Sequence, residues 1–234
     1  MREIDEAIIL GGGLGERLRP MTLTTPKILI DIAGKPILQW QIDWLRLHGV
    51  KRVVVACGHL SERIKYYLSD TNLGLSTELS IEKARLGTAG ALRLALPRTS
   101  GKDFFVLNGD IISKVDLSKF RSYYLTMGKI ASIIATPLRL PYGIVTVFNG
   151  LLESFIEKPE LPNWINGGIY IFSRKISEYL PEVGDLETEV FPKLSGEISV
   201  YMTREMWIPI DTVKDLREAE RLLGGKPNTR SGQS

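Results

Sequence analysis

The sequence has little histidine, almost no cysteine and no long apolar run. Two histidines and one cysteine stand among its 234 residues. A single cysteine excludes an internal disulfide framework. Cys57 ends the apolar run 53–57, a position typical of a small buried side chain rather than of a nucleophile. His48 and His59 show no metal-ligand or catalytic spacing. Chemistry based on cysteine or histidine is therefore not expected.

Signals for a membrane or a nucleic acid are also missing. Residues 1–6 carry acids where a signal peptide has positive charge before a long apolar stretch. No run approaches the roughly 20 apolar residues of a membrane helix. The 30 Lys and Arg are interspersed with 27 Asp and Glu, for a net charge of +3, so no basic stripe marks a nucleic-acid surface. We expect a cytoplasmic protein with no membrane or nucleic-acid partner.

The order of the predicted elements favours an α/β fold. Strand and helix patterns alternate in the first half, which predicts parallel strands in an open, layered sheet. The strands are expected at 7–10, 51–57, 75–82 and 103–107, and the helices at 36–48, 61–68 with Ser61 as cap, and 88–96. From residue 130 strands follow one another with few helices between, which predicts mixed pairing. We expect one domain over 1–223 and a flexible tail over 224–234.

A glycine-rich turn follows the first expected strand. Gly11, Gly12 and Gly13 let backbone N–H groups approach an anion closely, because no Cβ blocks the way. Arg17 and Lys27 follow and add fixed positive charge. The spacing matches neither the dinucleotide fingerprint nor the P-loop. These residues predict a different cradle for a polyphosphate.

The stretch 10–40 resembles the signature of the sugar-phosphate nucleotidyltransferases. That family has Gly-Gly-x-Gly-x-Arg-Leu-x-Pro, then Thr-x-x-x-Pro-Lys and Gly-Lys-Pro, which here read Gly12–Pro20, Thr22–Lys27 and Gly34–Pro36. The resemblance continues in family order through Leu86–Gly90, Asn108–Asp110, Glu157–Pro159 and Asn166–Tyr170, and so covers about residues 5 to 223. It implies a Rossmann-like α/β fold with a layered mixed sheet, of the nucleotide-diphospho-sugar transferase type.

The resemblance also implies a magnesium-dependent reaction that joins a sugar 1-phosphate to a nucleoside triphosphate and releases pyrophosphate. Arg17 is then expected on the leaving β- and γ-phosphates, and Lys27 between the reacting phosphates. Lys158 is expected on the sugar phosphate and Glu157 on the sugar hydroxyls. The remaining substrate-binding residues expected are Asn166 and Gly167 around the sugar, Gly12 and Gly87 at the base, and Gly11, Gly13 and Asn108.

Asp110, after the strand 103–107, is the first candidate for a Mg²⁺ ligand, because Mg²⁺ favours carboxylate and phosphate oxygens. Asn108-Gly109-Asp110 can also be only a turn. Many relatives carry a second metal-binding aspartate in Trp-x-Asp-x-Gly-Thr, where this chain has Pro209. We expect Asp211, two residues later, to take that role. The alternative is that Asp211 caps the helix that follows it.

The base and the sugar stay open between several members of the family. The segment 86–92 looks most like the mannose and heptose guanylyltransferases, which favours GTP and mannose 1-phosphate. The segments 34–38, 48–50 and 207–212 are similar to glucose-1-phosphate cytidylyltransferases, so cytidylyl-, uridylyl- or thymidylyl transfer also stays open. A regulatory nucleotide-sugar-binding subunit is another alternative, although such relatives usually lose the arginine or lysine kept here. A homo-oligomer is left open.

Overall fold

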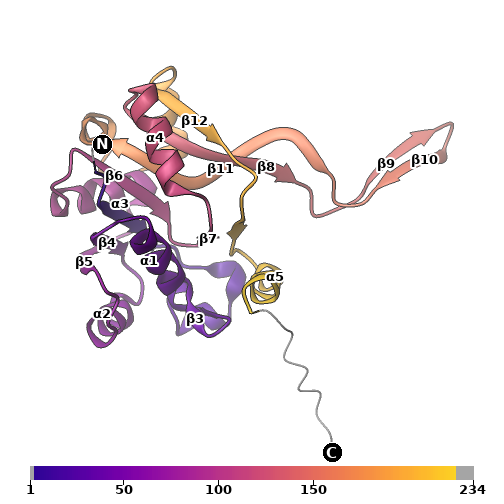
Figure 1. Ribbon diagram of the computed structural model, residues 1–234. Coiled ribbons are helices and arrows are strands. Elements are labelled where there is room, and N and C mark those ends of the chain that lie inside the picture. The colour runs from indigo at the N-terminus through magenta and orange to yellow at the C-terminus, as the bar shows by residue number, and fades with distance from the viewer. Residues whose placement is uncertain (1–2, 225–234) are drawn as a thin grey trace, which may run out of the picture.

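A seven-stranded sheet runs through the centre of the protein, in the order β12-β8-β11-β6-β1-β4-β5. The computed structural model describes residues 3–224 (Figure 1). The strands are β1 (Glu6–Leu10), β4 (Arg52–Cys57), β5 (Ser76–Ile81), β6 (Asp103–Asn108), β8 (Ala131–Arg139), β11 (Glu160–Ser173) and β12 (Ile198–Met202). Every neighbouring pair is parallel except the two pairs of β11 with β6 and β8. The predicted parallel first half and mixed second half are confirmed.

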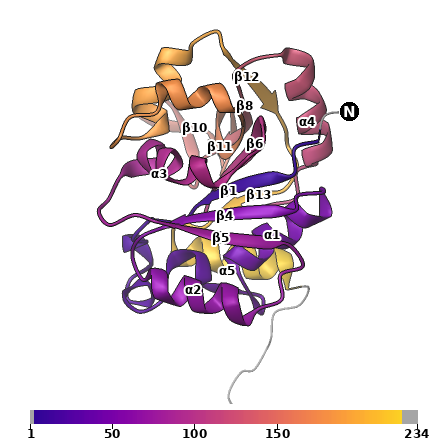
Figure 2. The same cartoon turned by 90° about the vertical axis from the view of Figure 1, so that its left-hand side faces the viewer.

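Helices cover both faces of this sheet (Figure 2). Successive side chains of a strand point to opposite faces. Ile9 of β1 therefore packs with α1 (Ile37–Leu47), α2 (Ser61–Asp70) and α4 (Leu117–Met127) on one side. Ile8 packs with α3 (Gly87–Ala95) and the helical turns of 174–194 on the other. Burial on both faces explains why β1, β4 and β6 read as continuous apolar runs.

A third apolar cluster holds the end of the chain against the loops that follow β1. α5 (Val213–Leu223) buries Leu216 and Ala219 beside Leu18 and Ile32. The short strands of this region are β2 (Asp31–Ile32), β3 (Lys35–Pro36), β7 (Ile111–Ser113) and β13 (Trp207–Pro209). Residues distant in the sequence are thereby brought to one end of the sheet.

Some local expectations were wrong or incomplete. Ser61 is not the cap of α2: it is the first helical residue, and Leu60 in a left-handed conformation precedes it. The helix α4 was not predicted, although its signals are present, with Asp116 as N-cap and Gly128 at the end. Cys57 is buried as expected, and burial raises the pKa of its thiol to about 11. The predicted tail lies outside the described residues, apart from Gly224. Across residues 3–224, every helix is too short or too polar to span a bilayer.

One hairpin leaves the body of the protein. It consists of β9 (Ile144–Phe148) and β10 (Leu151–Ile156), which connect β8 to β11 (Figure 1). Asn149 and Gly150 form its turn with φ of 48° and 78°, the left-handed values that a two-residue type I′ turn requires. Residues 144–156 are called the arm.

The N-cap of α4 gives a prediction about stability. The Asp116 carboxylate accepts hydrogen bonds from the backbone N–H groups of Ser118 and Lys119. Asp116→Ala should lower the free energy of unfolding by about 1 kcal/mol in urea titrations at neutral pH. Asp116→Asn should keep most of it, because Asn caps as well as Asp. A loss in Asp116→Asn as large as that in Asp116→Ala would assign the effect to the nearby Lys119 charge instead.

The same cap should be sensitive to acid. The pKa of Asp116 is lowered, and the largest cause is the hydrogen bond that its carboxylate accepts from the Lys119 N–H. A carboxylate with a lowered folded-state pKa stabilises the fold above its unfolded-state pKa of about 4, and this contribution disappears as the pH falls through the lower, folded-state value. The stability difference between wild type and Asp116→Ala should therefore shrink below about pH 4.

Candidate functional site

Several loops meet at the carboxyl edge of the parallel strands. Gly11 follows β1 and donates its N–H to the Ala56 carbonyl at 2.7 Å, and Gly109 follows β6 and donates to the Leu10 carbonyl at 2.8 Å. Because β11 runs antiparallel to β6, its residues 166–167, midway along the strand, lie at this edge just before the stretch that pairs with β6. In open α/β sheets, ligands bind in the crevice outside the carboxyl ends of the strands.

The turns after β1 and β6 pack too closely for side chains. A Cβ on Gly109 would stand 2.7 Å from Ile28 Cγ2, and one on Gly11 would stand 2.9 Å from Ile28 Cδ1. Gly13 differs, since a Cβ there would meet nothing within 4 Å. The backbone around Gly13 is therefore exposed and open to a ligand, as the polyphosphate prediction requires.

A buried ammonium joins the two predicted metal ligands. Lys27 Nζ lies 2.7 Å from Asp110 Oδ2 and 2.9 Å from Asp211 Oδ1. The Lys27 side chain is 10% exposed, whereas Asp110 and Asp211 are 34% and 46% exposed. Burial acts to lower the pKa of Lys27, but Asp110 and Asp211 outweigh it and raise the pKa above its usual value. The ammonium therefore stays charged at neutral pH.

Strand pairing brings Asp211 to this position. β13 pairs antiparallel with β7, and Pro209 stands opposite Ile111. The N–H of Ile210 then donates to the Asp110 carbonyl at 2.8 Å. The next residue, Asp211, consequently lies beside Asp110, although the aspartate of the common pattern is Pro209 here.

Thr212, not Asp211, is the N-cap of α5. The Thr212 hydroxyl accepts from the Asp215 N–H, and the Asp215 carboxylate accepts from the N–H of Thr212 at 2.7 Å. Asp215 also accepts from the N–H of Asp211 at 3.1 Å. The alternative that Asp211 serves as the helix cap is wrong. The Asp211 carboxylate instead faces Lys27, and the capping box fixes the backbone of Asp211 itself.

The donor set suits Mg²⁺. Within residues 3–224, no group of three or more His, Cys, Asp or Glu side chains could hold a metal. Mg²⁺ does not need such a cage, since one or two carboxylates plus substrate phosphates and water usually complete its octahedron. Asp110 and Asp211, facing one another across Lys27 beside an open glycine turn, fit that requirement.

Gln41 supports the turn that carries Asp110. From the buried face of α1, its Nε2 donates to the carbonyls of Asn108 at 2.8 Å and Ile111 at 2.9 Å. The sequence analysis missed this residue. Its signal was a polar side chain on the apolar stripe of a helix, beside Leu38 and Ile42.

A second network joins the α3 turn to β11. Asn166 donates to the Tyr170 hydroxyl at 2.8 Å, and that hydroxyl donates to Glu187 at 3.2 Å. Thr88 donates to the other oxygen of Glu187 at 3.1 Å. Burial, and next the charge of Glu187, raise the pKa of Tyr170, so its hydroxyl stays a neutral donor. Tyr170, Glu187 and Thr88 were not among the predicted site residues.

Two predicted positions are shaped by this network and its surroundings. Gly87 has a φ of 75°, and a Cβ there would overlap the Gly184 carbonyl, so glycine is required. Gly167 is buried, and its carbonyl accepts from Trp207 Nε1 at 2.7 Å. The side-chain oxygen of Asn108 is buried without a hydrogen-bond partner among residues 3–224.

Three predicted residues lie away from the Lys27 cluster. Arg17 is exposed on the helical turn Glu16–Leu18. Glu157 and Lys158 are exposed where the arm joins β11, and they pair with each other at 3.8 Å. The three charged side chains are accessible to a ligand. In the part of the chain that the structure describes, they form no ion pair with Asp110.

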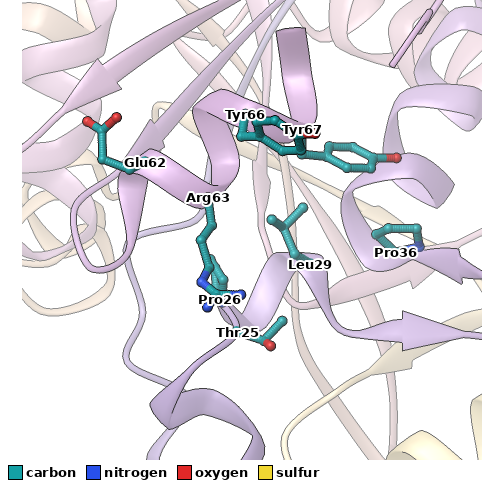
Figure 3. Close-up of a pocket in the computed structure, with 8 residues that line it drawn as sticks. All are labelled: Thr25, Pro26, Leu29, Pro36, Glu62, Arg63, Tyr66 and Tyr67. Carbon is teal, nitrogen blue, oxygen red and sulfur yellow. The ribbon is translucent and has the colours of Figure 1, made fainter. Parts of the chain in front are cut away.

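A hollow of about 420 Å³ lies beside this site (Figure 3). Pro26 and Leu29, which flank Lys27 in the sequence, form part of one wall of the hollow. Tyr66 and Tyr67 of α2 form part of the other wall. The remaining lining residues are Thr25, Pro36, Glu62 and Arg63. The hollow is mostly apolar and does not include the glycine turn, so it is separate from the predicted phosphate cradle.

The chain is similar to several known proteins. The family model described as Nucleotidyl transferase matches residues 6–224. Mannose-1-phosphate guanylyltransferase 1 of Arabidopsis thaliana is 37% identical over 93% of this chain and 64% of its own length. The catalytic subunit beta of mannose-1-phosphate guanylyltransferase from Drosophila melanogaster is 37% identical over 89% of this chain and 60% of its own. The chain thus spans 60 to 64% of the length of these two relatives.

Solved structures show the same fold. HddC from Yersinia pseudotuberculosis superposes with a TM-score of 0.78 and 28% identity, over 94% of this chain and 99% of HddC, and it has also been solved with GMP-PN. A putative glucose-1-phosphate thymidylyltransferase from Bacillus anthracis gives a TM-score of 0.75 at 22% identity, over 97% of each chain. The predicted Rossmann-like layered sheet is confirmed.

The contacts of Gln41 lead to a prediction that does not depend on activity. Gln41→Met keeps the size of the side chain but leaves two carbonyls without their donor. It should lower the free energy of unfolding by about 2–4 kcal/mol in urea titrations. Gln41→Glu should lower the free energy of unfolding further at pH 8. Its stability should recover towards pH 5, where a protonated carboxyl can donate a hydrogen bond again. A pH-independent loss in Gln41→Glu would contradict the role of Gln41 as a donor.

Proposed function

Because the chain belongs to the nucleotidyl transferase family, we propose that it joins mannose 1-phosphate to GTP, giving GDP-mannose and pyrophosphate in the cytoplasm. The observation that carries this proposal is the contact of Lys27 with both Asp110 and Asp211. The glycine-rich turn reaches this cluster at Gly15, where a Cβ would stand 3.3 Å from Lys27 Cβ. The names of the similar guanylyltransferases support the choice of base and sugar. We assign the activity to residues 1–223 as one domain.

The reaction needs positioning and charge more than proton transfer. A sugar 1-phosphate oxygen is already ionised near neutral pH and can attack the α-phosphorus without a general base. A new bond then forms between this oxygen and the α-phosphorus, while the bond from the α-phosphorus to the β-phosphate oxygen breaks. The protein has to hold two anions together and neutralise the charge that develops.

In this proposal Arg17 binds the β- and γ-phosphates that leave, and Lys27 contacts the reacting phosphates. Asp110 and Asp211 would hold Mg²⁺, which would supply neutralising charge on the phosphates. Lys27, which contacts both carboxylates, would also lie within reach of the phosphates.

The sugar and the base are assigned to opposite ends of the Tyr170 network. Asn166, Gly167 and Asn108 would line the sugar pocket, where Asn166 is exposed. Glu157 and Lys158 would reach the sugar hydroxyls and phosphate from the root of the arm. The remaining assigned positions are Gly11, Gly12 and Gly13 at the phosphates and base, and Gly87 at the base.

Turnover tests the proposal directly. With Mg²⁺, the purified chain should release pyrophosphate from GTP only when mannose 1-phosphate is present. A matrix of five triphosphates against several sugar 1-phosphates checks the base and the sugar. Activity with CTP, UTP or dTTP alone would replace the assigned base. Nucleotide-sugar binding with no turnover anywhere in the matrix would identify a regulatory subunit.

The two cations should differ in how they affect stability. Arg17→Ala and Lys27→Ala should each cost about 2–4 kcal/mol of transition-state stabilisation, measured from kcat/KM. Arg17 is exposed, so its loss should leave the melting temperature unchanged. Lys27→Ala leaves two carboxylates facing each other, so its melting temperature should be lower than that of the wild type. Added Mg²⁺ should raise the melting temperature of Lys27→Ala by more than it raises that of the wild type. Identical Mg²⁺ responses would contradict a cation position shared by Lys27 and the metal.

The role of Asp211 can be separated from that of the helix cap. Asp211→Asn should leave α5 capped, because Thr212 and Asp215 form the capping box. It should raise the Mg²⁺ concentration needed for half-maximal rate and lower kcat steeply. Asp116→Ala, which removes the cap of the separate helix α4, is the control: it should lower the free energy of unfolding by about 1 kcal/mol while the Mg²⁺ requirement changes little. An unchanged Mg²⁺ requirement in Asp211→Asn would leave Asp110 as the proposed ligand and remove Asp211.

A further inference from the structure

The hollow beside Lys27 has no part in the proposed reaction, although it is large enough for a small molecule. Its volume of about 420 Å³ falls within the roughly 300–1,000 Å³ that is typical of small-molecule pockets. We propose that this hollow is a regulatory site for a molecule that combines a flat apolar ring with an anionic group. Binding in the hollow does not depend on the proposed function, whereas its regulatory effect rests on that function.

The walls of the hollow offer apolar rings that are already in position. Pro26 and Pro36 both line the hollow, and a proline ring has little conformational freedom to lose. Tyr67 is held in place because its hydroxyl donates to Gln39 at 2.6 Å. Tyr66, its neighbour on α2, is 69% exposed, so most of its ring is free for contact with a ligand. These rings can receive a flat apolar group at little cost in ordering.

A cation at the hollow lacks an acidic partner. Arg63 lines the hollow, and Figure 3 shows its side chain extending from α2 towards Pro26 and Thr25. The neighbouring acid, Glu62, points away from the other residues in Figure 3 and pairs with Lys65 at 3.9 Å. Among residues 3–224, no carboxylate forms an ion pair with Arg63. A free guanidinium beside an apolar wall favours a ligand with an anionic group at one end of its ring.

The hollow shares a turn of the chain with the proposed phosphate site. Pro26 and Leu29 line the hollow on either side of Lys27 in the sequence. The turn is tight, since the Leu29 N–H donates to the Pro26 carbonyl at 2.8 Å. The Lys27 ammonium contacts both Asp110 and Asp211. A shift of the wall at Pro26 or Leu29 therefore also shifts the backbone that carries this ammonium.

The direction of the coupling follows from the shape of the hollow. A ligand that fits the hollow as it stands favours the position of the turn in which Lys27 contacts both carboxylates. On the proposed function, a triphosphate would compete with Asp110 and Asp211 for the same ammonium. The hollow ligand should therefore weaken triphosphate binding, and a triphosphate should weaken binding in the hollow by the same factor.

Binding is tested with two small molecules by titration calorimetry, without nucleotide or Mg²⁺. The first, 1-naphthyl phosphate, has both the ring and the anionic group, and the second, 1-naphthol, has only the ring. The wild type should bind 1-naphthyl phosphate more tightly than 1-naphthol. Arg63→Gln should raise the dissociation constant of 1-naphthyl phosphate about 10-fold, because a charge-assisted hydrogen bond is lost, and should leave that of 1-naphthol unchanged.

Matched variants separate the hollow from the rest of the surface. Lys65→Gln removes a positive charge from the same helix without touching the lining of the hollow, and should leave both dissociation constants unchanged. Tyr66→Ser should raise both constants about 5-fold, because both molecules lose a ring contact. Tyr142→Ser removes a ring of similar exposure, 75%, outside the hollow, and should change neither. These four side chains are exposed, so the variants should fold.

Adding GTP with Mg²⁺ tests the regulatory effect. The dissociation constant of 1-naphthyl phosphate should rise about 5-fold or more and then level off once GTP fills its own site. In turnover assays, 1-naphthyl phosphate should raise the KM for GTP. A rise without limit would mean that both molecules compete for one site, and it would overturn the proposal.

Two further results would also contradict the proposal. Equal binding of 1-naphthyl phosphate to the wild type and Arg63→Gln would remove the ligand site. Bound GTP that leaves the dissociation constant of 1-naphthyl phosphate unchanged would remove the regulatory effect. GTP binding and turnover are measured separately: their absence would contradict the proposed function and the regulation that rests on it, while the ligand site is decided by Arg63→Gln alone.

Discussion

The site depends on one constraint: two carboxylates from distant parts of the chain must stand side by side at the edge of the sheet. Asp110 and Asp211 carry like charges, and the Lys27 ammonium between them makes their proximity tolerable. Because Asp110 and Asp211 are 34% and 46% exposed, their pairing with Lys27 adds little net stability, whereas removing Lys27 would leave both charges uncompensated. Lys27 matters through position, since its buried stem fixes where the charge lies. The supporting contacts, Gln41 under the Asp110 turn and the capping box after Asp211, hold the two backbones on which this arrangement rests.

The direction of the strands explains why the other site residues gather there. Parallel strands deliver the glycine turn and Asn108 to one edge, because each leaves the sheet at its carboxyl end. β11 is the exception: it runs the other way, so it reaches that edge at Asn166, midway along the strand, and continues into the core with Tyr170. One strand therefore supplies both an exposed polar residue and a buried hydroxyl. That hydroxyl connects Asn166 to Glu187, and so connects the two ends of the site that we assign to sugar and base.

Local patterns were enough to predict the fold and the glycine turn, because buried strands and glycine-rich turns leave marks within a few residues. They did not reveal Gln41 or Glu187, whose partners are 67 or more residues away for Gln41 and 17 and 99 away for Glu187. A polar residue on an apolar stripe indicates that a partner exists without identifying it. The role of Asp211 could be predicted only in part. Its spacing from Pro209 allowed either a metal ligand or a cap, and only the pairing of β13 with β7 shows which backbone it lies beside.

The structure also limits how the proposed metal can enter. Two half-exposed carboxylates already neutralised in part by Lys27 attract a free cation weakly, because the ammonium occupies the space between them. A triphosphate changes this balance. On the proposed function, it would offer Lys27 and Arg17 a stronger anion and would bring further oxygen atoms near Asp110 and Asp211. Since Mg²⁺ binds proteins mainly through a few carboxylates together with phosphates, Asp110 and Asp211 would hold the cation better with a nucleotide present. On the proposed function, the ammonium that pairs with both carboxylates is the same charge that the phosphates would meet.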